Sequence, residues 1–405
     1  MKKILIINGE PFQDQTATGI TLKNIFDRFP RENVKYIHVS KLLPDLDYLD
    51  NVFSYYKDSV ERKKEHQAFA SLQSLHDQNK IKAAIKNELR VWDDLRKAKI
   101  SKGLVNFIIE SESEIIYTCL GNLKVISLVL YARELLKCTV VPHFLDDWKS
   151  VIFSKKRYFI HKLLLQRRLK SLFKNVDVGI AISEEMAKQY KQEFNCPFNV
   201  IMNCVPDEQI LDSYKSPNTR VKKFVFAGGL HLDRWKSLYN LAEAFDIISS
   251  RYEFIIEIYC PERDKNKFCG YFKKFNFVHF MGHLPVAEID RVMKSADILI
   301  HCESFDSSIR KYTRLSVSTK IPTYLKTGKL ILAFGPEEIE SIQYIKLNQA
   351  GIAISVQDPE ALSQILLTDI FNSNVSELLV KNATALVRRN HSCSSVERKL
   401  TEIFT

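Results

Sequence analysis

The chain has 405 residues, more than one hydrophobic core usually serves, so about two domains are expected. Its apolar content of 45% is ordinary for a globular protein, and no apolar run approaches the ~20 residues of a membrane-spanning helix, which favours a soluble or membrane-peripheral protein. The formal net charge of +11 indicates an anionic partner: a nucleic acid, a phosphorylated substrate or an acidic membrane surface.

The first half alternates between strand and helix patterns. A short apolar run from Lys3 to Asn8, a helix pattern after Gly19 and a strand at Val34–Val39 form a βαβ unit, which favours a parallel sheet. Residues 50–110 are rich in Lys, Glu, Gln and Ala and predict a helical insertion. The alternation then resumes, with strands expected at 114–118, 139–144, 176–182 and 199–203, and helices at 123–137, 154–174 and from Ser183 onward.

The second half repeats this organisation after a polar, proline-containing linker at 206–223. Strands are expected at 222–230, 253–260, 277–283 and 297–302, with helices at 237–248 and 286–296 between them and a final helix at 375–404. The fold class predicted is α/β, with two facing Rossmann-like doubly wound domains and a cleft between them. The expected divisions are 1–205, 206–385 and a C-terminal helix at 386–405 that packs back on the first domain.

Charged and hydroxyl side chains follow the strands of the second half. Glu303 ends a buried strand, and a loop rich in hydroxyls and cations comes after it. Open α/β sheets bind ligands at the carboxyl ends of their strands, so this segment predicts a site for sugar and phosphate groups. Gly228 and Gly229 end another strand and would let backbone amides approach a ligand, with Arg234 and Lys236 as cations nearby. The alternative is a tight turn with solvated cations.

The order of these segments resembles the GT-B glycosyltransferases, in particular family 4 and its bacterial surface-polysaccharide branch. The resemblance covers almost the whole chain. It is carried by Gly19, by His143 with Asp146, Asp147 and Trp148, by VDVGIAISEEM, FAGGLHLDRWKSL and MGHLPVAEIDRVMKSADILIHCESF, and by STKIPTYLKTGK.

The resemblance implies roles for the residues of the second domain. Arg234 would contact the donor diphosphate, with Lys236 or Lys320 as a second cation, and Glu303 would contact the donor sugar. Gly19 resembles the glycine loop near the donor phosphates. Ser318 and Thr319, with Ser316, could reach phosphate oxygens at a helix N-terminus or could simply cap that helix. Thr323 stands where the family has a second glutamate, and a hydroxyl cannot accept from two ribose hydroxyls as a carboxylate does.

In the first domain, His143, Asp146 and Asp147 follow a strand on the side that the resemblance assigns to the acceptor. They could orient or deprotonate an acceptor hydroxyl. Family 4 enzymes retain anomeric configuration, and the departing phosphate itself can take the proton, so a dedicated base is not required. A helix cap or an interdomain salt bridge is the alternative for the two aspartates.

The segment Ser154–Lys174 has eight Lys or Arg and no acid, with apolar residues near helical spacing. It could lie on an anionic membrane surface, where a polyprenyl-diphosphate-linked acceptor would be found, or it could be a domain helix with a solvated basic face.

No catalytic metal or other cofactor is expected. The one DxD match, Asp45-Leu46-Asp47, sits in a polar turn and reads as accidental, and there is no GxxxxGK[ST], HExxH or GxSxG motif. Eight scattered cysteines without a CxxC pair, and an N-terminus too short and polar for a secretory signal, indicate reduced thiols in a cytoplasm.

The leading hypothesis is a cytoplasmic, membrane-peripheral hexosyltransferase. It would move a sugar from a nucleotide-sugar to a lipid-linked glycan acceptor for bacterial capsule, O-antigen or exopolysaccharide synthesis. The alternatives are a nucleotide-sugar 2-epimerase of the same fold and a catalytically silent binding subunit. A nucleic-acid-binding function fits the charge, but no recognised module supports it.

Overall fold

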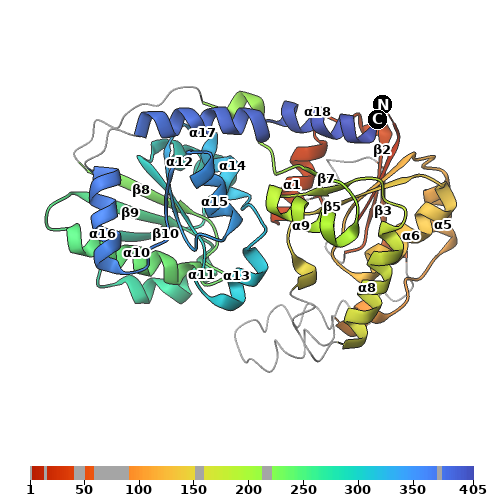
Figure 1. Ribbon diagram of the computed structural model, residues 1–405, viewed down its shortest axis with the longest axis horizontal. Coiled ribbons are helices and arrows are strands. Elements are labelled where there is room, and N and C mark those ends of the chain that lie inside the picture. Colours follow the sequence, from red (N-terminus) through yellow and green to blue (C-terminus); the bar gives the residue numbers. More distant parts are fainter. Residues whose placement is uncertain are drawn as a thin grey trace. The chain divides into compact units, whose positions relative to one another are not determined.

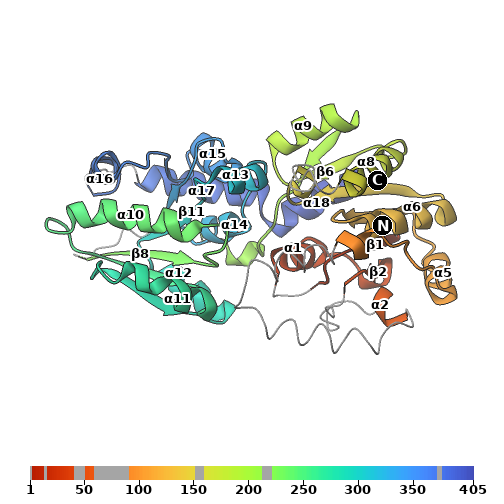
Figure 2. The same ribbon diagram turned by 90° about the horizontal axis from the view of Figure 1, so that it is seen from below.

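The computed structural model describes residues 2–12, 16–40, 51–58, 91–150, 159–211, 221–371 and 376–405, which form two parallel β-sheets. The chain divides into two compact units. The first consists of Met1–Ile201 and Glu397–Thr405, and the second of Met202–Val396. Helices lie on both faces of each sheet (Figures 1 and 2).

The first sheet has the strand order β3-β2-β1-β4-β5-β6-β7, with every neighbouring pair parallel. Its strands are β1 (Ile4–Asn8), β2 (Val34–His38), β3 (Val52–Ser54), β4 (Ile115–Cys119), β5 (Thr139–Phe144), β6 (Gly179–Ala181) and β7 (Phe198–Val200). The helices of this unit are α1 (Ala17–Phe26), η1 (Arg31–Asn33), α2 (Tyr55–Asp58), α5 (Lys102–Ile109), α6 (Leu123–Leu136), α8 (Phe159–Phe173) and α9 (Glu184–Phe194).

The strands at the centre of this sheet are buried along their whole length because helices cover both faces. Every residue of β1 and β4 is buried, so these strands read as continuous apolar runs rather than as alternating patterns. The helices begin where polar side chains satisfy the first free amides: Thr16, Asn122 and Ser183 accept from the backbone amides of Gly19, Val125 and Met186.

The second sheet has the order β10-β9-β8-β11-β12-β13 and is also parallel throughout. Its strands are β8 (Lys222–Ala227), β9 (Phe254–Tyr259), β10 (Val278–Gly282), β11 (Ile298–Cys302), β12 (Leu330–Phe334) and β13 (Ile352–Ile354). The helices are η3 (Asp207–Gln209), α10 (Arg234–Ile248), α11 (Glu262–Phe268), η4 (Cys269–Phe272), α12 (Val286–Ser295), α13 (Ser307–Thr313), α14 (Lys320–Leu325), α15 (Glu340–Leu347), α16 (Pro359–Leu366), the π-helical turn η5 (Leu367–Phe371) and α17 (Ser376–Asn390).

The strand order of the second sheet is that of a Rossmann fold. The chain winds outward from β8 to β10 and then returns to the other side of β8 with β11. Such a reversal leaves a crevice at the carboxyl ends of the two central strands, here β8 and β11, where ligands bind in doubly wound folds. The predicted α/β class with two Rossmann-like sheets is confirmed.

The structure differs from the sequence-based expectation in the region 50–110. This region was expected to be helical, but Val52–Ser54 extend the first sheet, with Val52 paired to Tyr36 and Phe53 to Ile37. The short β-branched and aromatic run satisfies its backbone by pairing with β2. Residues 59–90, and with them most of the expected insertion, lie outside the described residues, as do Asp45-Leu46-Asp47 and part of the linker.

The C-terminal segment is two helices rather than one. α17 ends at Asn390, and α18 (Cys393–Phe404) begins after His391 and Ser392. α18 starts in the second unit and ends in the first, where the Phe404 ring lies 6.0 Å from that of Phe29. The two chain ends lie side by side, with Lys2 Nζ donating to Thr405 O at 2.8 Å (Figure 1). Only Glu397–Thr405 return to the first unit, and residues 386–396 belong to the second.

Candidate functional site

The candidate site lies at the carboxyl ends of β8 and β11 in the second unit. Gly228 follows β8 with φ 138°, a backbone conformation that side chains rarely permit, and its amide donates to Tyr259 O at 2.8 Å. Glu303 follows β11, which pairs with β8. These two residues therefore mark the two sides of the switch point of the sheet.

Arg234 and Glu303 form a buried ion pair at this point. Arg234 is the first residue of α10, and its Nη2 lies 3.3 Å from both carboxylate oxygens of Glu303, which is only 2% exposed. Ser237, one turn further along α10, donates to Glu303 O at 2.7 Å. Burial by itself would raise the pKa of Glu303, but the Arg234 guanidinium outweighs it and lowers that pKa to about 2. Glu303 is thus a carboxylate at neutral pH.

His301 lies beside this pair on β11. It is fully buried, and burial lowers its pKa, so the imidazole is neutral near pH 7. Its Nε2 is 3.2 Å from Glu303 Oε1, and neither ring nitrogen has a hydrogen-bond partner among the described residues. His301 was not among the site residues expected from the sequence. A histidine in an otherwise apolar strand, two residues before an acid on the same face, was the available signal.

Lys320, the first residue of α14, brings a second cation to Gly228. A Cβ atom at Gly228 would overlap Lys320 Cε and Nζ, so only glycine leaves room for this side chain. Lys320 Nζ lies 4.2 Å from the centre of the Phe226 ring, is buried and has no hydrogen-bond partner within the described ranges. Burial and repulsion from Arg234 lower the pKa of Lys320 to about 7.

These side chains leave several buried nitrogen atoms unsatisfied in one place. Arg234 Nε, Lys320 Nζ and both nitrogens of His301 lack partners in the described part of the chain. Leaving a buried donor unpaired costs about 1–3 kcal/mol, and more for a charged group. A cluster that tolerates this cost, with two cations around an open glycine backbone, is suited to bind the oxygens of an anion.

The loop between β8 and α10 is strained. Leu232 and Asp233 both adopt positive φ, 58° and 54°, directly before Arg234. Leu230 N donates to Asp264 Oδ2 at 2.8 Å, and a Cβ at Gly229 would contact the exposed His231 ring. The backbone is thereby bent so that α10 starts with Arg234 facing Glu303.

The other residues expected at the donor site make contacts of their own and do not bond to Arg234 or Glu303. Lys236 is exposed and pairs with Asp233 at 2.7 Å, so it does not join Arg234 and Glu303. Ser318 and Thr319 lead into α14: Ser318 N donates to Ser341 Oγ at 2.9 Å, and Thr319 is the N-cap residue without a side-chain capping bond. Thr323 donates back to Thr319 O at 3.4 Å within the helix. Ser316 Oγ is buried without a partner among the residues described.

The expected acceptor residues of the first unit are packed into its core. His143 is fully buried, with Nδ1 2.6 Å from Tyr117 Oη and Nε2 3.1 Å from Ile201 O, and burial lowers its pKa to about 3. An imidazole with both nitrogens engaged and no exposed edge is unsuited to deprotonate a hydroxyl, which corrects the catalytic role expected for it. His143 is buried because helices cover both faces of the sheet at β5.

Asp146 and Asp147 have structural contacts of different kinds. Asp147 is buried and accepts from Tyr190 Oη at 2.6 Å. Asp146 is partly exposed and accepts from Trp148 N at 3.2 Å, as expected for a residue that starts a turn. Gly19 is a residue of the first turn of α1, where its amide donates to the Thr16 side chain at 3.1 Å.

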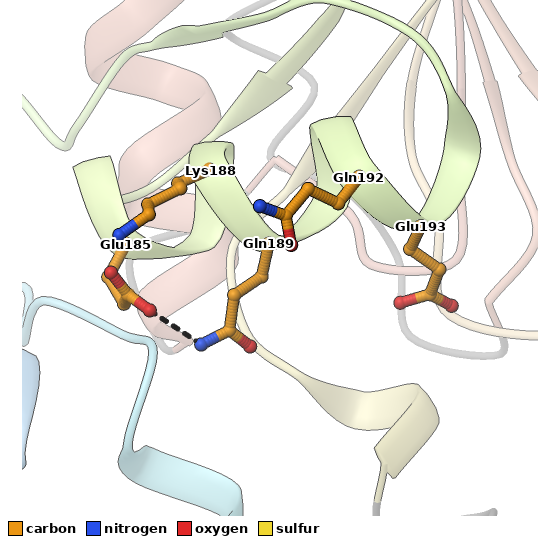
Figure 3. Close-up of a pocket in the computed structure, with 5 residues that line it drawn as sticks. All are labelled: Glu185, Lys188, Gln189, Gln192 and Glu193. Carbon is orange, nitrogen blue, oxygen red and sulfur yellow. Dashed lines mark hydrogen bonds between the residues drawn. The ribbon is translucent and has the colours of Figure 1, made fainter.

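A surface hollow elsewhere on the first unit does not contain any of these residues. It is lined by Glu185, Lys188, Gln189, Gln192 and Glu193, all from α9, with Gln189 Nε2 donating to Glu185 Oε1 at 2.7 Å (Figure 3). Binding sites usually combine polar groups from several elements with apolar surface, so this row of side chains on one helix does not compete with the cluster at β8 and β11.

The described residues contain neither a metal-binding cluster nor a membrane-spanning helix. No group of three or more His, Cys, Asp or Glu side chains in these ranges is arranged to hold a metal ion, and the expectation of a metal-independent protein stays a prediction. Within the same ranges, every helix is too short or too polar to cross a lipid bilayer.

Solved structures share the fold of this chain. Anabaena Alr3699/HepE in complex with UDP-glucose superposes with a TM-score of 0.63 at 14% identity, covering 100% of this chain and 99% of that one. WaaG, a glycosyltransferase involved in lipopolysaccharide biosynthesis, gives 0.58 at 13% identity with 99% of each chain covered. The chain has a GT-B-like fold. A putative UDP-N-acetylglucosamine 2-epimerase from Listeria monocytogenes also matches, at 0.55 and 10% identity over 100% of this chain and 96% of that one.

A distant relative matches part of the sequence. The uncharacterized glycosyltransferase MJ1069 of Methanocaldococcus jannaschii is 22% identical over 272 residues. The match covers 63% of this chain and 64% of the relative, slightly less than two thirds of its length. No protein-family model matches the chain.

Proposed function

We propose that the chain is a glycosyltransferase that moves a sugar, of the hexose class, from a nucleotide-sugar donor to a glycan acceptor. The observation that carries this proposal is the cluster of Arg234, Lys320 and Glu303 around Gly228, at the switch point of a sheet whose fold matches glycosyltransferase structures. The glycosyltransferase relative at 22% identity supports the same reading.

The cluster supplies what departure of a nucleoside diphosphate needs. Negative charge grows on the diphosphate as its bond to the sugar breaks, and cations fixed nearby stabilise that charge. Arg234 Nη2 donates to Glu303, and Arg234 Nε is left to donate to a phosphate oxygen. Lys320 Nζ lies against the backbone of Gly228. Their pre-set positions avoid reorganisation during the reaction.

Glu303 is the residue proposed to hold the donor sugar. It is ionised at neutral pH, and a carboxylate accepts hydrogen bonds from sugar hydroxyls with both oxygens. The ion pair with Arg234 fixes its orientation. As the resemblance implies, the proposed reaction retains anomeric configuration without a metal, and the departing phosphate takes the acceptor proton, a route that does not require His143.

The acceptor proposed is a lipid-linked glycan of bacterial capsule, O-antigen or exopolysaccharide synthesis. Support for this comes from the resemblance to the surface-polysaccharide branch, from the shared fold with WaaG and from the net charge of +11, which suits an anionic acceptor carrier. The protein would then act in the cytoplasm.

Two other functions have specific support. A 2-epimerase shares the fold, although the Listeria structure superposes less closely than HepE, and it would isomerise the donor sugar without any acceptor. A silent binding subunit is favoured by Thr323, which lacks the carboxylate that the resemblance places there. It would bind the nucleotide-sugar without transfer or hydrolysis.

A ligand screen tests the proposal. The purified chain is heated with UDP, GDP, CDP, TDP or ADP, with and without magnesium, and the nucleotide-sugar of any stabilising base is then incubated with and without glycan acceptors. Ligand binding raises the midpoint by mass action. We expect one diphosphate to stabilise the wild type and Lys236→Ala but not Arg234→Ala or Lys320→Ala.

Lys236→Ala is the matched control because Lys236 is a nearby exposed cation whose ion pair is with Asp233 and not with Glu303. Equal stabilisation of all variants, or isomerisation of the sugar without acceptor, would contradict the proposal.

A further inference from the structure

The outer face of α8 carries large apolar side chains that are not packed. The helix turns His161, Leu165, Leu169, Leu172 and Phe173 inward and lies beside α6 (Figure 1). At its first turns Phe159 and Ile160 are 68% and 66% exposed, and Leu164 is 36% exposed. Exposed apolar residues scattered singly are ordinary, but three within one and a half turns of a helix form an apolar tip.

Positively charged side chains follow the apolar residues along the outer face of α8. Arg167 lies two turns after Ile160 and therefore on the same side of the helix, and Arg168 and Lys170 flank it. All three are exposed, and no ion pair joins them to an acid in the described part of the chain. The helix contains no Asp or Glu. The face thus combines an apolar tip with a row of uncompensated positive charge.

A neighbouring segment extends this surface. Asp94, in the helical residues 91–95, pairs with His161 at 2.7 Å and fixes that segment beside the start of α8. Trp92, two residues before Asp94, is 66% exposed. Tryptophan is enriched where proteins meet the headgroup region of a bilayer, because its ring is apolar and its indole nitrogen is a donor.

We propose that α8 docks the protein on an anionic lipid bilayer, with Phe159, Ile160 and Leu164 inserted at the level of the headgroups and Arg167, Arg168 and Lys170 against the lipid phosphates. A nucleic acid would satisfy the cations but would leave the apolar tip in water. A second copy of the chain would bring like charges together across a two-fold contact. A bilayer with anionic headgroups is the one partner that matches both parts of the face.

This inference goes beyond the proposed transfer reaction and does not rest on it, because vesicle binding is measured without donor or acceptor. It states which residues carry the contact and divides them into an inserted set and an electrostatic set. The two sets have different signatures: salt weakens only the electrostatic part.

The test is co-sedimentation of the full chain with vesicles of phosphatidylglycerol and phosphatidylcholine in equal parts, and with vesicles of phosphatidylcholine alone. We expect binding to the first and not to the second. The triple variant Arg167→Gln, Arg168→Gln, Lys170→Gln is expected to lower the partition coefficient about 100-fold, since each cation near the surface contributes about fivefold at low salt.

The double variant Phe159→Ser, Ile160→Ser is expected to lower it about tenfold or more and to leave the salt dependence unchanged. The matched controls are in the second unit: Arg291→Gln, Lys311→Gln, Lys381→Gln for charge, and Leu347→Ser, which is 75% exposed, for apolar surface. Both controls are expected to bind as the wild type does. Circular dichroism and thermal melting show that each variant is folded.

Three outcomes would overturn the proposal. Equal binding to both kinds of vesicle would exclude an electrostatic contact. A triple variant that binds like its charge control would place the contact elsewhere on the protein. Tighter binding of a 20-base-pair DNA duplex than of anionic vesicles, unaffected by Phe159→Ser, Ile160→Ser, would assign the face to nucleic acid.

Discussion

Lys320 is expected to take up a proton when the donor binds. Burial and the neighbouring Arg234 lower its pKa from 10.5 to about 7, so about half of the molecules carry the ammonium at pH 7 before ligand is added. A diphosphate placed against Lys320 Nζ favours the charged form and raises this pKa again. Binding should therefore draw about half a proton from solvent at pH 7 and nearly one at pH 8.

The affinity follows the same linkage. It is expected to be constant below pH 7, where Lys320 is already charged, and to fall as the pH rises above 7. The decrease is at most about tenfold per pH unit and continues until the pKa of the complex is passed. A group with its ordinary pKa of 10.5 would show no change in this range.

The assay is titration calorimetry at pH 7 and pH 8 in buffers of different ionisation enthalpy. The ligand is the nucleotide-sugar that gives the largest thermal shift, because its two esterified phosphates do not titrate near neutrality. Lys320→Met should lose the proton uptake, whereas Lys236→Met, which alters an exposed cation, should keep it. Uptake of the same size in Lys320→Met, or none in the wild type, would refute the assignment of Lys320 to the diphosphate.

Further predictions concern the carboxylate, the glycine turn, the ribose position and the buried histidine. Glu303→Gln should lower the free energy of unfolding by about 3 kcal/mol at pH 7, since the folded pKa is about 2 against 4.5; the difference should shrink as pH falls below 4.5, and a pH-independent difference in urea titrations would contradict the charge on Glu303. Gly228→Ala should cost about 1–3 kcal/mol in the same titrations and abolish nucleotide binding, because its Cβ displaces Lys320 at a positive φ; wild-type affinity would show that the turn relaxes. Thr323→Glu should lower KM for the nucleotide-sugar about fivefold or more by supplying a second acceptor for the ribose, and an unchanged or higher KM in initial-rate assays would remove Thr323 from the site. His143→Leu should destabilise the first unit by about 2–4 kcal/mol by removing the imidazole that pairs with Tyr117 Oη and Ile201 O, without removing a limb from the pH–rate profile; loss of such a limb would restore a proton-transfer role.

Local patterns in the sequence predict the parts of the site that depend on one strand and the turn after it. Gly228 and Glu303 each end a continuous apolar run, and the parallel sheet brings such ends to one edge. Deciding whether Lys236 or Lys320 is the second cation of the site requires the three-dimensional structure. Lys236 is two residues after Arg234 and so faces almost the opposite side of α10, a relation that becomes clear only when the helix start is known. Lys320 reaches Gly228 through the packing of α14, which no local pattern encodes.

In the first unit, the burial of His143 could likewise not be predicted from the local sequence. His143 is the last residue but one of the strand pattern TVVPHF and was expected to face the acceptor. Whether such a residue is exposed or enclosed depends on the elements stacked over it. Here Tyr117 from β4 and the carbonyl of Ile201 close over both ring nitrogens, and these partners lie 26 and 58 residues away in sequence. Periodicity within one strand carries no information about them.

The return of Glu397–Thr405 to the first unit has a consequence for biosynthesis. The Phe404 ring lies 6.0 Å from Phe29 and 6.5 Å from Tyr117, so part of the apolar surface of the first unit is covered by residues translated after the whole second unit. At ~5–20 residues per second, the nascent first unit waits roughly ten seconds or longer for its last piece. Over that interval Phe29 and Tyr117 are available to a chaperone on the ribosome, and the order of translation decides when the first unit can close its core.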